Sequence, residues 1–159
     1  KHIHQNWELV KEYPLSKELL ALSHVWVSPN KKNYVIAAKG APEAIINLCH
    51  FSKKDTDKIM EKVREMAARG LRVLGVAKGE FTKKELPTKQ HTFDFKFVGL
   101  LGFVDPVRIN VADSVSEAYS AGMRIIMITG DYPGTACHVA RKIGLRNPEK
   151  FITGEEFAH

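Results

Sequence analysis

The stretch NYVIAAKGAPE, residues 33–43, contains the change of pattern on which the fold of this chain depends. Residues 33–38 carry Tyr, Val and Ile in a run of strand length, which predicts a β-strand. Lys39 and Gly40 end that run, and Pro42 is well placed for the first turn of a helix that we expect to end near His50. This stretch therefore predicts a strand followed directly by a helix.

Four more runs of strand length lie around this stretch, all before residue 105. They are rich in Val, Ile, Leu and aromatic residues, and turn residues such as Ser28-Pro29 and Leu86-Pro87 bound them. A second helix is expected over residues 55–68, because its apolar residues form one stripe and Gly70 follows it. The four further strands are expected at residues 7–12, 20–27, 71–78 and 95–104.

The pattern changes to alternating helix and strand after residue 105. Two helices are expected, over residues 111–120 and 133–143, each followed within two residues by a glycine. Between them, residues 123–129 form a nearly continuous apolar run, as expected for a strand covered on both faces, and Phe151-Ile152 is expected to open another. This order predicts a doubly wound α/β unit, and hence a chain of the α/β (α+β) class.

Composition limits the classes of function. The 159 residues are 44% hydrophobic and 26% charged, which is typical of a folded domain and not of a disordered or fibrous chain. No apolar run approaches the roughly 18 to 20 residues of a membrane helix, and no secretory signal opens the chain, so the sequence reads as soluble. It does not begin with Met, which is compatible with an excerpt of a longer protein. The formal charge of +6 suggests an anionic partner; nucleotide phosphate fits it, and no RNA-binding sheet motif is present.

Both cysteines adjoin a histidine, in Cys49-His50 and Cys137-His138. Adjacent residues on a helix point about 100° apart, and a zinc ion takes about four ligands, so neither pair forms a good chelate. We therefore expect free thiols and no metal site within the chain.

Thr129-Gly130-Asp131 follows the apolar run at 123–129 and precedes an expected helix. Ligands of open α/β sheets bind at the carboxyl ends of strands, and glycine lets a backbone approach a phosphate closely. The threonine hydroxyl can bond a phosphoryl oxygen, and the carboxylate can orient a water, a ribose or the hydration shell of a metal. The alternative is an ordinary turn in which Asp131 caps the helix.

Two further segments allow both a functional and a plain interpretation. Asp105-Pro106-Val107-Arg108 could form a rigid charged element beside an anion site, or a domain-junction turn with a local ion pair. Lys39 could contact a phosphate or the edge of adenine, or could be a surface lysine at the end of a strand. The sequence around Lys39 is not a Walker A loop, because the Gly-Lys-Ser/Thr order is missing.

Taken together, these segments resemble the signatures of the P-type ATPases. Residues 39–43, 105–108 and 127–131 look like the KGAPE, DPPR and MITGD motifs of that family and occur in the same order. The sequences of residues 134–136 and 153–157 are similar to the family as well, so that the resemblance covers almost the whole chain. It is a resemblance to the type II group, the calcium-pump-like cation ATPases, and to bacterial members.

The resemblance implies a domain division and a set of site residues. Residues 1–104 would be the later part of the nucleotide-binding domain, an antiparallel sheet with flanking helices, and residues 105–159 a partial, haloacid-dehalogenase-like phosphorylation domain. ATP would be bound by Tyr13, stacked on adenine, by Lys39 and Gly40 in the pocket, and by Arg72 at the phosphates. Thr129, Gly130 and Asp131 would face the γ-phosphate, supported by Asp105 and Arg108.

The resemblance also implies a function for the intact protein. ATP and Mg²⁺ would be its cofactors, an aspartyl-phosphate intermediate would drive cation transport, and the chain would be a cytoplasmic part of a cell-membrane protein. Its partners would be ATP and the phosphorylation, actuator and membrane domains of the same pump, with no nucleic acid. The DKTGT and GDGxND motifs, which supply the phosphorylated aspartate and most Mg²⁺ ligands, are not in this sequence, so we expect the chain alone to be inactive. The rival interpretations are a stand-alone phosphatase of the haloacid-dehalogenase type and a basic module that binds nucleic acid or an acidic partner.

Overall fold

The computed structural model describes residues 6–29, 33–82 and 85–157, which belong to two compact units. The first unit comprises residues 1–61 and 73–101, and the second comprises residues 62–72 and 102–159. The change of unit at residues 101 and 102 lies close to the change of sequence pattern near residue 105. The segment 62–72 joins the second unit although it precedes that point in the sequence.

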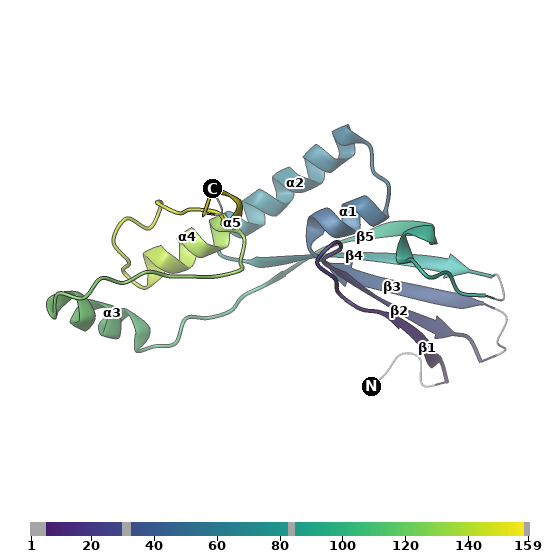
Figure 1. Cartoon of the computed structure of the whole chain (residues 1–159), viewed down its shortest axis with the longest axis horizontal. Helices are drawn as coiled ribbons and strands as arrows, with labels where there is room; N and C mark the ends of the chain where they lie inside the picture. Colours follow the sequence, from purple (N-terminus) through teal and green to yellow (C-terminus); the bar gives the residue numbers. More distant parts are fainter. Residues whose placement is uncertain (1–5, 30–32, 83–84, 158–159) are drawn as a thin grey trace. The chain divides into compact units, whose positions relative to one another are not determined.

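A five-stranded antiparallel sheet organises the first unit (Figure 1). Its spatial order, β1-β2-β3-β4-β5, follows the sequence, so each strand lies beside its neighbours in the chain. All five strands expected from the sequence are present, with ends that differ by no more than three residues. They span Glu8–Tyr13 (β1), Ala21–Val27 (β2), Tyr34–Gly40 (β3), Arg72–Phe81 (β4) and Phe95–Phe103 (β5).

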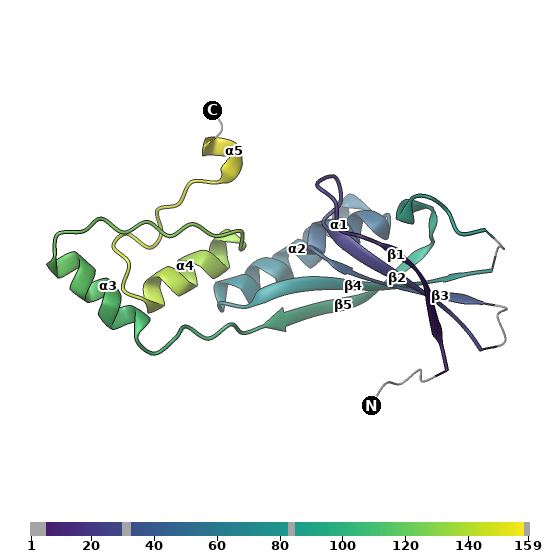
Figure 2. The same ribbon diagram turned by 60° about the horizontal axis from the view of Figure 1, so that its bottom comes forward.

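One face of this sheet carries the core. Buried and less buried residues alternate along β2 and β3, and the buried side chains pack against helix α1, Pro42–Leu48. Val25 and Ile36 from the sheet and Ile45 from α1 are fully buried there. Figures 1 and 2 show α1 and α2 on the same side of the sheet. No helix among the described residues of the first unit covers the other side of β2 and β3 (the open face). Side chains on the open face remain available to a ligand.

Helix α2, Lys53–Ala68, begins two residues before its expected start. Ser52 fixes this end, because its hydroxyl oxygen accepts the N–H of Asp55 at 3.2 Å and its hydroxyl donates to the Asp55 carboxylate at 2.7 Å. Val63 and Ala67 of the expected apolar stripe are buried. The helix closes through a hydrogen bond from Gly70 to the Ala67 carbonyl, and Gly70 has a φ of 78°, which glycine adopts without strain.

The short 3-10 helix η1, Gln90–Thr92, connects the segment before β5 to the core face of β2. The buried Ser23 hydroxyl donates to the Gln90 side-chain oxygen at 2.5 Å, and the Gln90 amide donates to the Ala21 carbonyl at 3.2 Å. Both buried polar side chains therefore have partners, as burial of an amide and a hydroxyl requires.

The second unit contains three helices of its own among its described residues. α3, Val111–Ser120, and α4, Pro133–Lys142, confirm the two helices expected in this half of the chain. The third, α5 (Gly154–Phe157), is a single turn that begins after Thr153, whose backbone N–H donates to the Glu156 carboxylate at 2.8 Å. The expected strand at Phe151-Ile152 is wrong, because both residues are exposed and form no strand.

The strand expected at Met123–Thr129 does not form either. None of the described strands pairs with this segment, and Ile126 and Ile128 are 67% and 93% exposed. An apolar run becomes a strand only when neighbouring strands take up its N–H and C=O groups. The α+β class and the antiparallel sheet are confirmed, whereas the described part of the second unit has the helices of a doubly wound unit without its sheet.

Candidate functional site

Lys39 lies at the end of β3, on the open face of the sheet. The antiparallel registers place it directly opposite Leu22 of β2 on one side and Val76 of β4 on the other. Lys39 is exposed, and Leu22 and Val76 are half-buried. An ammonium group between two aliphatic side chains can bind an anionic group while the aliphatic side chains contact a flat apolar one.

Gly40 allows the chain to turn from this lysine into α1. A Cβ added at Gly40 would overlap with the Leu20 carbonyl oxygen and with Ala21, so only glycine fits this crossing. The next residue, Ala41, donates its N–H to the same Leu20 carbonyl at 2.9 Å. This contact fixes the start of β2 beside the end of β3 and leaves Leu20, 53% exposed, next to the Lys39 end of the open face.

Tyr13 lies on the opposite face of the sheet from Lys39. It is 6% exposed, its ring meets Phe93 edge-on at 5.5 Å between centroids, and its hydroxyl donates to the Pro87 carbonyl. The cause is a bulge in β1: Leu9 is paired with Trp26, but Lys11 is paired with Val25 and Tyr13 with Ser23. This one-residue shift moves the side chain of Tyr13 from the open face to the core face. The expected stacking of Tyr13 on adenine therefore does not fit the position of its ring.

Thr129, Gly130 and Asp131 form a turn in the second unit, in which Thr129 and Gly130 are exposed and Asp131 is half-buried. The Thr129 hydroxyl oxygen accepts the N–H of Asp131 at 3.1 Å, which leaves its hydroxyl proton free to donate to a phosphoryl oxygen. An added Cβ at Gly130 would meet nothing within 4 Å, so the backbone there is open to a ligand. The residue that precedes α4 as its N-cap is Tyr132, with no side-chain cap, so that the alternative role of Asp131 as a capping residue is not found.

Arg72 belongs to the same unit and meets this turn. Its Nε lies 3.4 Å from a carboxylate oxygen of Asp131, and the two side chains are 65% and 32% exposed. The structure therefore brings together two of the expected site residues that lie far apart in the sequence. The pair is largely solvated, so its own contribution to stability is small.

Asp105 and Arg108 are both described, both are exposed, and no ion pair joins them. The hydrogen bond and the ion pair of the Thr129–Asp131 turn involve neither of them. The plain interpretation of this segment as a turn fits its exposure, and the local ion pair that was part of that interpretation is not formed.

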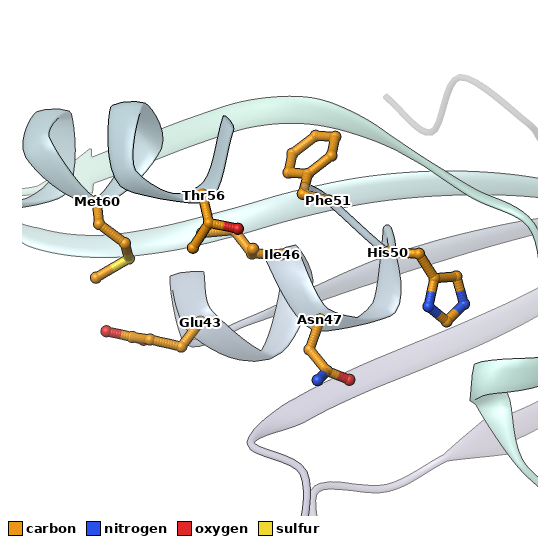
Figure 3. A pocket seen from close by; sticks show the side chains of 7 residues that line it. All are labelled: Glu43, Ile46, Asn47, His50, Phe51, Thr56 and Met60. Carbon is orange, nitrogen blue, oxygen red and sulfur yellow. The ribbon is translucent and has the colours of Figure 1, made fainter. Parts of the chain in front are cut away.

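A hollow of about 520 Å³ on the first unit does not coincide with these residues (Figure 3). It lies beside α1 and the start of α2, on the helix-bearing side of the sheet and not on the open face of Lys39. Figure 3 shows its lining side chains, which are Glu43, Ile46, Asn47, His50, Phe51, Thr56 and Met60. Neither Lys39 nor its neighbours Leu22 and Val76 line this hollow.

Comparison with known proteins decides the family. Residues 1–110 match the family model described as P-type ATPase, cytoplasmic domain N. The chain belongs to the P-type ATPases.

Several P-type ATPases are similar to it over most of its length. A probable cation-transporting ATPase I of Mycobacterium leprae is 30% identical over 98% of this chain, and a potassium-transporting ATPase alpha chain 2 of Rattus norvegicus is 34% identical over 77%. The endoplasmic reticulum calcium ATPase srcA of Aspergillus fumigatus is 30% identical over 98%. The chain spans only 10%, 14% and 18% of the lengths of these three relatives. In the part of this P-type ATPase chain that the structure describes, no helix is both long enough and apolar enough to cross a membrane.

Sequence reasoning missed two residues of the candidate nucleotide surface of this P-type ATPase, Leu22 and Val76. Each becomes a neighbour of Lys39 only through the strand register. The alternation along residues 21–27 shows that Leu22 lies on one face of a strand, but the register across the connections to β3 and from β3 to β4 is not readable from spacing. The sequence therefore indicates on which face of its strand Leu22 lies, but it does not indicate that Lys39 is the residue opposite it.

The described residues include no group of three His, Cys, Asp or Glu side chains that could hold a metal ion. Cys49 and Cys137 are free thiols, the first partly buried and the second buried. Burial raises the pKa of the Cys49 thiol, and the negative charge of Asp94 raises it further. A raised pKa lowers the fraction of Cys49 that is present as the nucleophilic thiolate at neutral pH.

Proposed function

We propose that this chain is an ATP-binding part of a cation-transporting P-type ATPase and that the first unit binds ATP on the open face around Lys39. Family membership supports the choice of ligand, and the exposed lysine between Leu22 and Val76 supports the place. The relatives are named as cation-transporting, potassium-transporting and calcium ATPases.

The residues around Lys39 fit a nucleotide chemically. The ammonium group donates up to three hydrogen bonds and can reach a phosphate or the acceptor edge of adenine. Leu22 and Val76 offer aliphatic surface for the face of the adenine base. They would take the place of the stacking contact that was expected from Tyr13. Gly40 keeps the end of β3 close to the start of β2, because a Cβ there would overlap with the Leu20 carbonyl oxygen and with Ala21.

We propose a second role for the turn of the second unit, at the transferred phosphoryl group in the intact pump. The Thr129 hydroxyl and the Gly130 backbone would donate to phosphoryl oxygens, Arg72 would neutralise charge, and Asp131 would orient Arg72. Fixed donors of this kind stabilise the charge that develops during phosphoryl transfer. Asp105 and Arg108 are proposed only as electrostatic support, because both are exposed and neither takes part in the hydrogen bond or ion pair of the turn.

Magnesium would neutralise phosphate charge when bound, but the described residues contain no cluster of ligands for it. We propose no magnesium site among them. The remaining domains of the pump, including those that cross the membrane and the one that supplies the phosphorylated aspartate, are the proposed partners, which would make this chain a cytoplasmic part of a membrane protein.

Titration of the 159-residue chain with ATP tests the proposal, with Lys39→Ala as the variant and Lys53→Ala as the matched control. A charge-assisted hydrogen bond is worth about 1.5–3 kcal/mol, so Lys39→Ala is expected to weaken ATP binding roughly ten- to a hundredfold. Lys53, in the exposed first turn of α2, should change the affinity by less than about twofold. Equal affinities of the two variants would show that Lys39 is only a surface lysine.

The same titration distinguishes a general anion-binding module. Such a module would bind inorganic tripolyphosphate as well as ATP and lose affinity steeply with added salt. ATP bound on the Lys39 surface should instead be preferred over tripolyphosphate, because the base contacts Leu22 and Val76.

A further inference from the structure

The end of α2 and the start of α4 meet at a closely packed junction within the second unit. Gly134 lies against Ala67 and Ala68, and an added Cβ there would already be 3.4 Å from their backbone atoms. An added Cβ at Gly70 would overlap with the ring of His138. Small residues on both sides therefore let the two helices approach, and the junction leaves little freedom to the segment that follows Gly70.

Thr135 adds a specific bond to this junction. Its side chain is 5% exposed, and its hydroxyl donates to the Leu71 carbonyl oxygen at 2.9 Å. Leu71 directly precedes Arg72, and Thr135 stands four residues after Asp131. Two polar contacts therefore join the same two segments: Thr135 to the Leu71 backbone, and Asp131 to the Arg72 side chain.

We propose that Thr135 is a positioning residue: its hydroxyl holds the Leu71-Arg72 backbone so that Arg72 stays paired with Asp131 and forms one anion-binding element with Thr129 and Gly130. The anion-binding role rests on the proposed function, but the positioning does not. A solvated arginine and aspartate hold each other weakly and cost side-chain entropy to order, so their backbones must already be in place. The buried hydroxyl supplies that placement at one side of the pair.

The element has a defined chemistry for an anion. The Asp131 carboxylate pairs with the Nε of the Arg72 guanidinium, which leaves the other guanidinium N–H groups free to donate. The Thr129 hydroxyl proton is free, because its oxygen is the acceptor in the turn. A phosphoryl group is the ligand that such a guanidinium and hydroxyl fit.

The test is the NMR signal of the Arg72 Nε–H in the isotope-labelled 159-residue chain, without nucleotide. Asp131→Asn gives the reference signal of an unpaired Arg72. Thr135→Val, which keeps the shape and removes the hydroxyl, is expected to move the Arg72 signal most of the way to that reference. Thr135→Ser, which keeps the hydroxyl, is expected to retain the wild-type signal.

Ser114→Ala is the control. The exposed Ser114 hydroxyl also donates to a backbone carbonyl in the second unit, that of Asn110, at 2.9 Å. Ser114 is far from Arg72 in the sequence, and this hydrogen bond does not involve Arg72. It should leave the signal unchanged. A Thr135→Val chain that melts earlier yet keeps the wild-type Arg72 signal would mean that Thr135 only stabilises the fold. If Thr135→Val does not fold, loss of the signal in folded Thr135→Ser overturns the proposal. Because no nucleotide is present, a chain that fails to bind ATP does not affect this result.

Discussion

At the scale of single residues, the face on which a side chain lies decides what it can bind. The family resemblance implies that both Tyr13 and Lys39 contact a nucleotide, yet the bulge in β1 turns Tyr13 into the core while Lys39 stays on the open face. Arg72 and Asp131, by contrast, stand 59 positions apart and meet at 3.4 Å. Separation along the sequence does not predict which side chains make contact, because strand register and helix packing determine these contacts.

The pairing of Asp131 with Arg72 predicts the effect of Asp131→Asn on nucleotide affinity. The variant removes no group from the proposed Lys39 surface, which lies in the other unit, and it frees Arg72 from a solvated ion pair worth about 0–1 kcal/mol. ATP affinity of the chain is therefore expected to stay within about fivefold of the wild type. Calorimetric titration of both proteins measures it. Disappearance of ATP binding in Asp131→Asn would contradict the assignment of ATP to the first unit.

Cys49 gives a prediction about pH. Its thiol has a pKa raised first by burial and then by Asp94, so the folded chain disfavours the thiolate. Since the folded pKa lies above the unfolded one, this group's contribution to stability is complete below the unfolded pKa and is lost as pH rises. Alkylation of Cys49 by iodoacetamide, followed by mass spectrometry, should accelerate at higher pH in the folded chain than in the urea-unfolded chain. Coincident pH profiles would show that the thiol is effectively solvated.

At the scale of elements, the aromatic cluster around Phe93 holds the sheet to the segment before β5. Phe93 is 1% exposed, and its ring meets Tyr13, Phe81 and Phe95 edge-on at 5.5, 5.2 and 5.8 Å between centroids. Such edge-to-face pairs add to the free energy that burial of each ring contributes. The rings of Tyr13, Phe81 and Phe95 belong to β1, β4 and β5, so a single side chain links three strands of the sheet.

Phe93→Ala is therefore expected to lower the free energy of unfolding by about 3–5 kcal/mol, from lost burial and the cavity that remains. Phe157→Ala removes the same side chain from a position that is 83% exposed, and should change stability by less than about 0.5 kcal/mol. Urea unfolding of the two variants, followed by circular dichroism, compares them directly. Equal losses would mean that Phe93 does not anchor the sheet.

The sequence predicted the elements whose signals are local. Strand composition, the proline that opens α1 and the glycines after α2, α3 and α4 place nearly every strand and helix. It did not predict the bulge in β1, because a bulge leaves no residue signature when neither Gly nor Pro marks it. It also predicted a strand at 123–129, because an apolar run reports a preference for burial and says nothing about whether partner strands are present.

At the scale of the whole molecule, the two units carry different parts of the proposed chemistry. The first presents Lys39 on an open sheet face, and the second presents the Arg72–Asp131 pair and the Thr129 hydroxyl. Neither unit shows an aspartate in the family's DKTGT context, since that motif is not in the sequence. The chain also spans less than a fifth of the length of the relatives it matches. We therefore expect that this chain can bind ATP without the steps that hydrolyse it.

The chain is expected to bind ATP without hydrolysing it in steady state. Turnover through an aspartyl-phosphate needs a carboxylate nucleophile and a bound metal, and the described residues lack both the motif that supplies the nucleophile and a cluster of metal ligands. Phosphate release from ATP and Mg²⁺ should match a buffer blank, while the same preparation binds ATP in a titration. A trace of contaminating ATPase would be equally active in the Lys39→Ala and Asp131→Asn proteins, prepared in parallel. Magnesium-dependent release that either substitution abolished would instead show that the chain contains a complete catalytic site, and the proposed division between binding here and catalysis in the intact pump would be wrong.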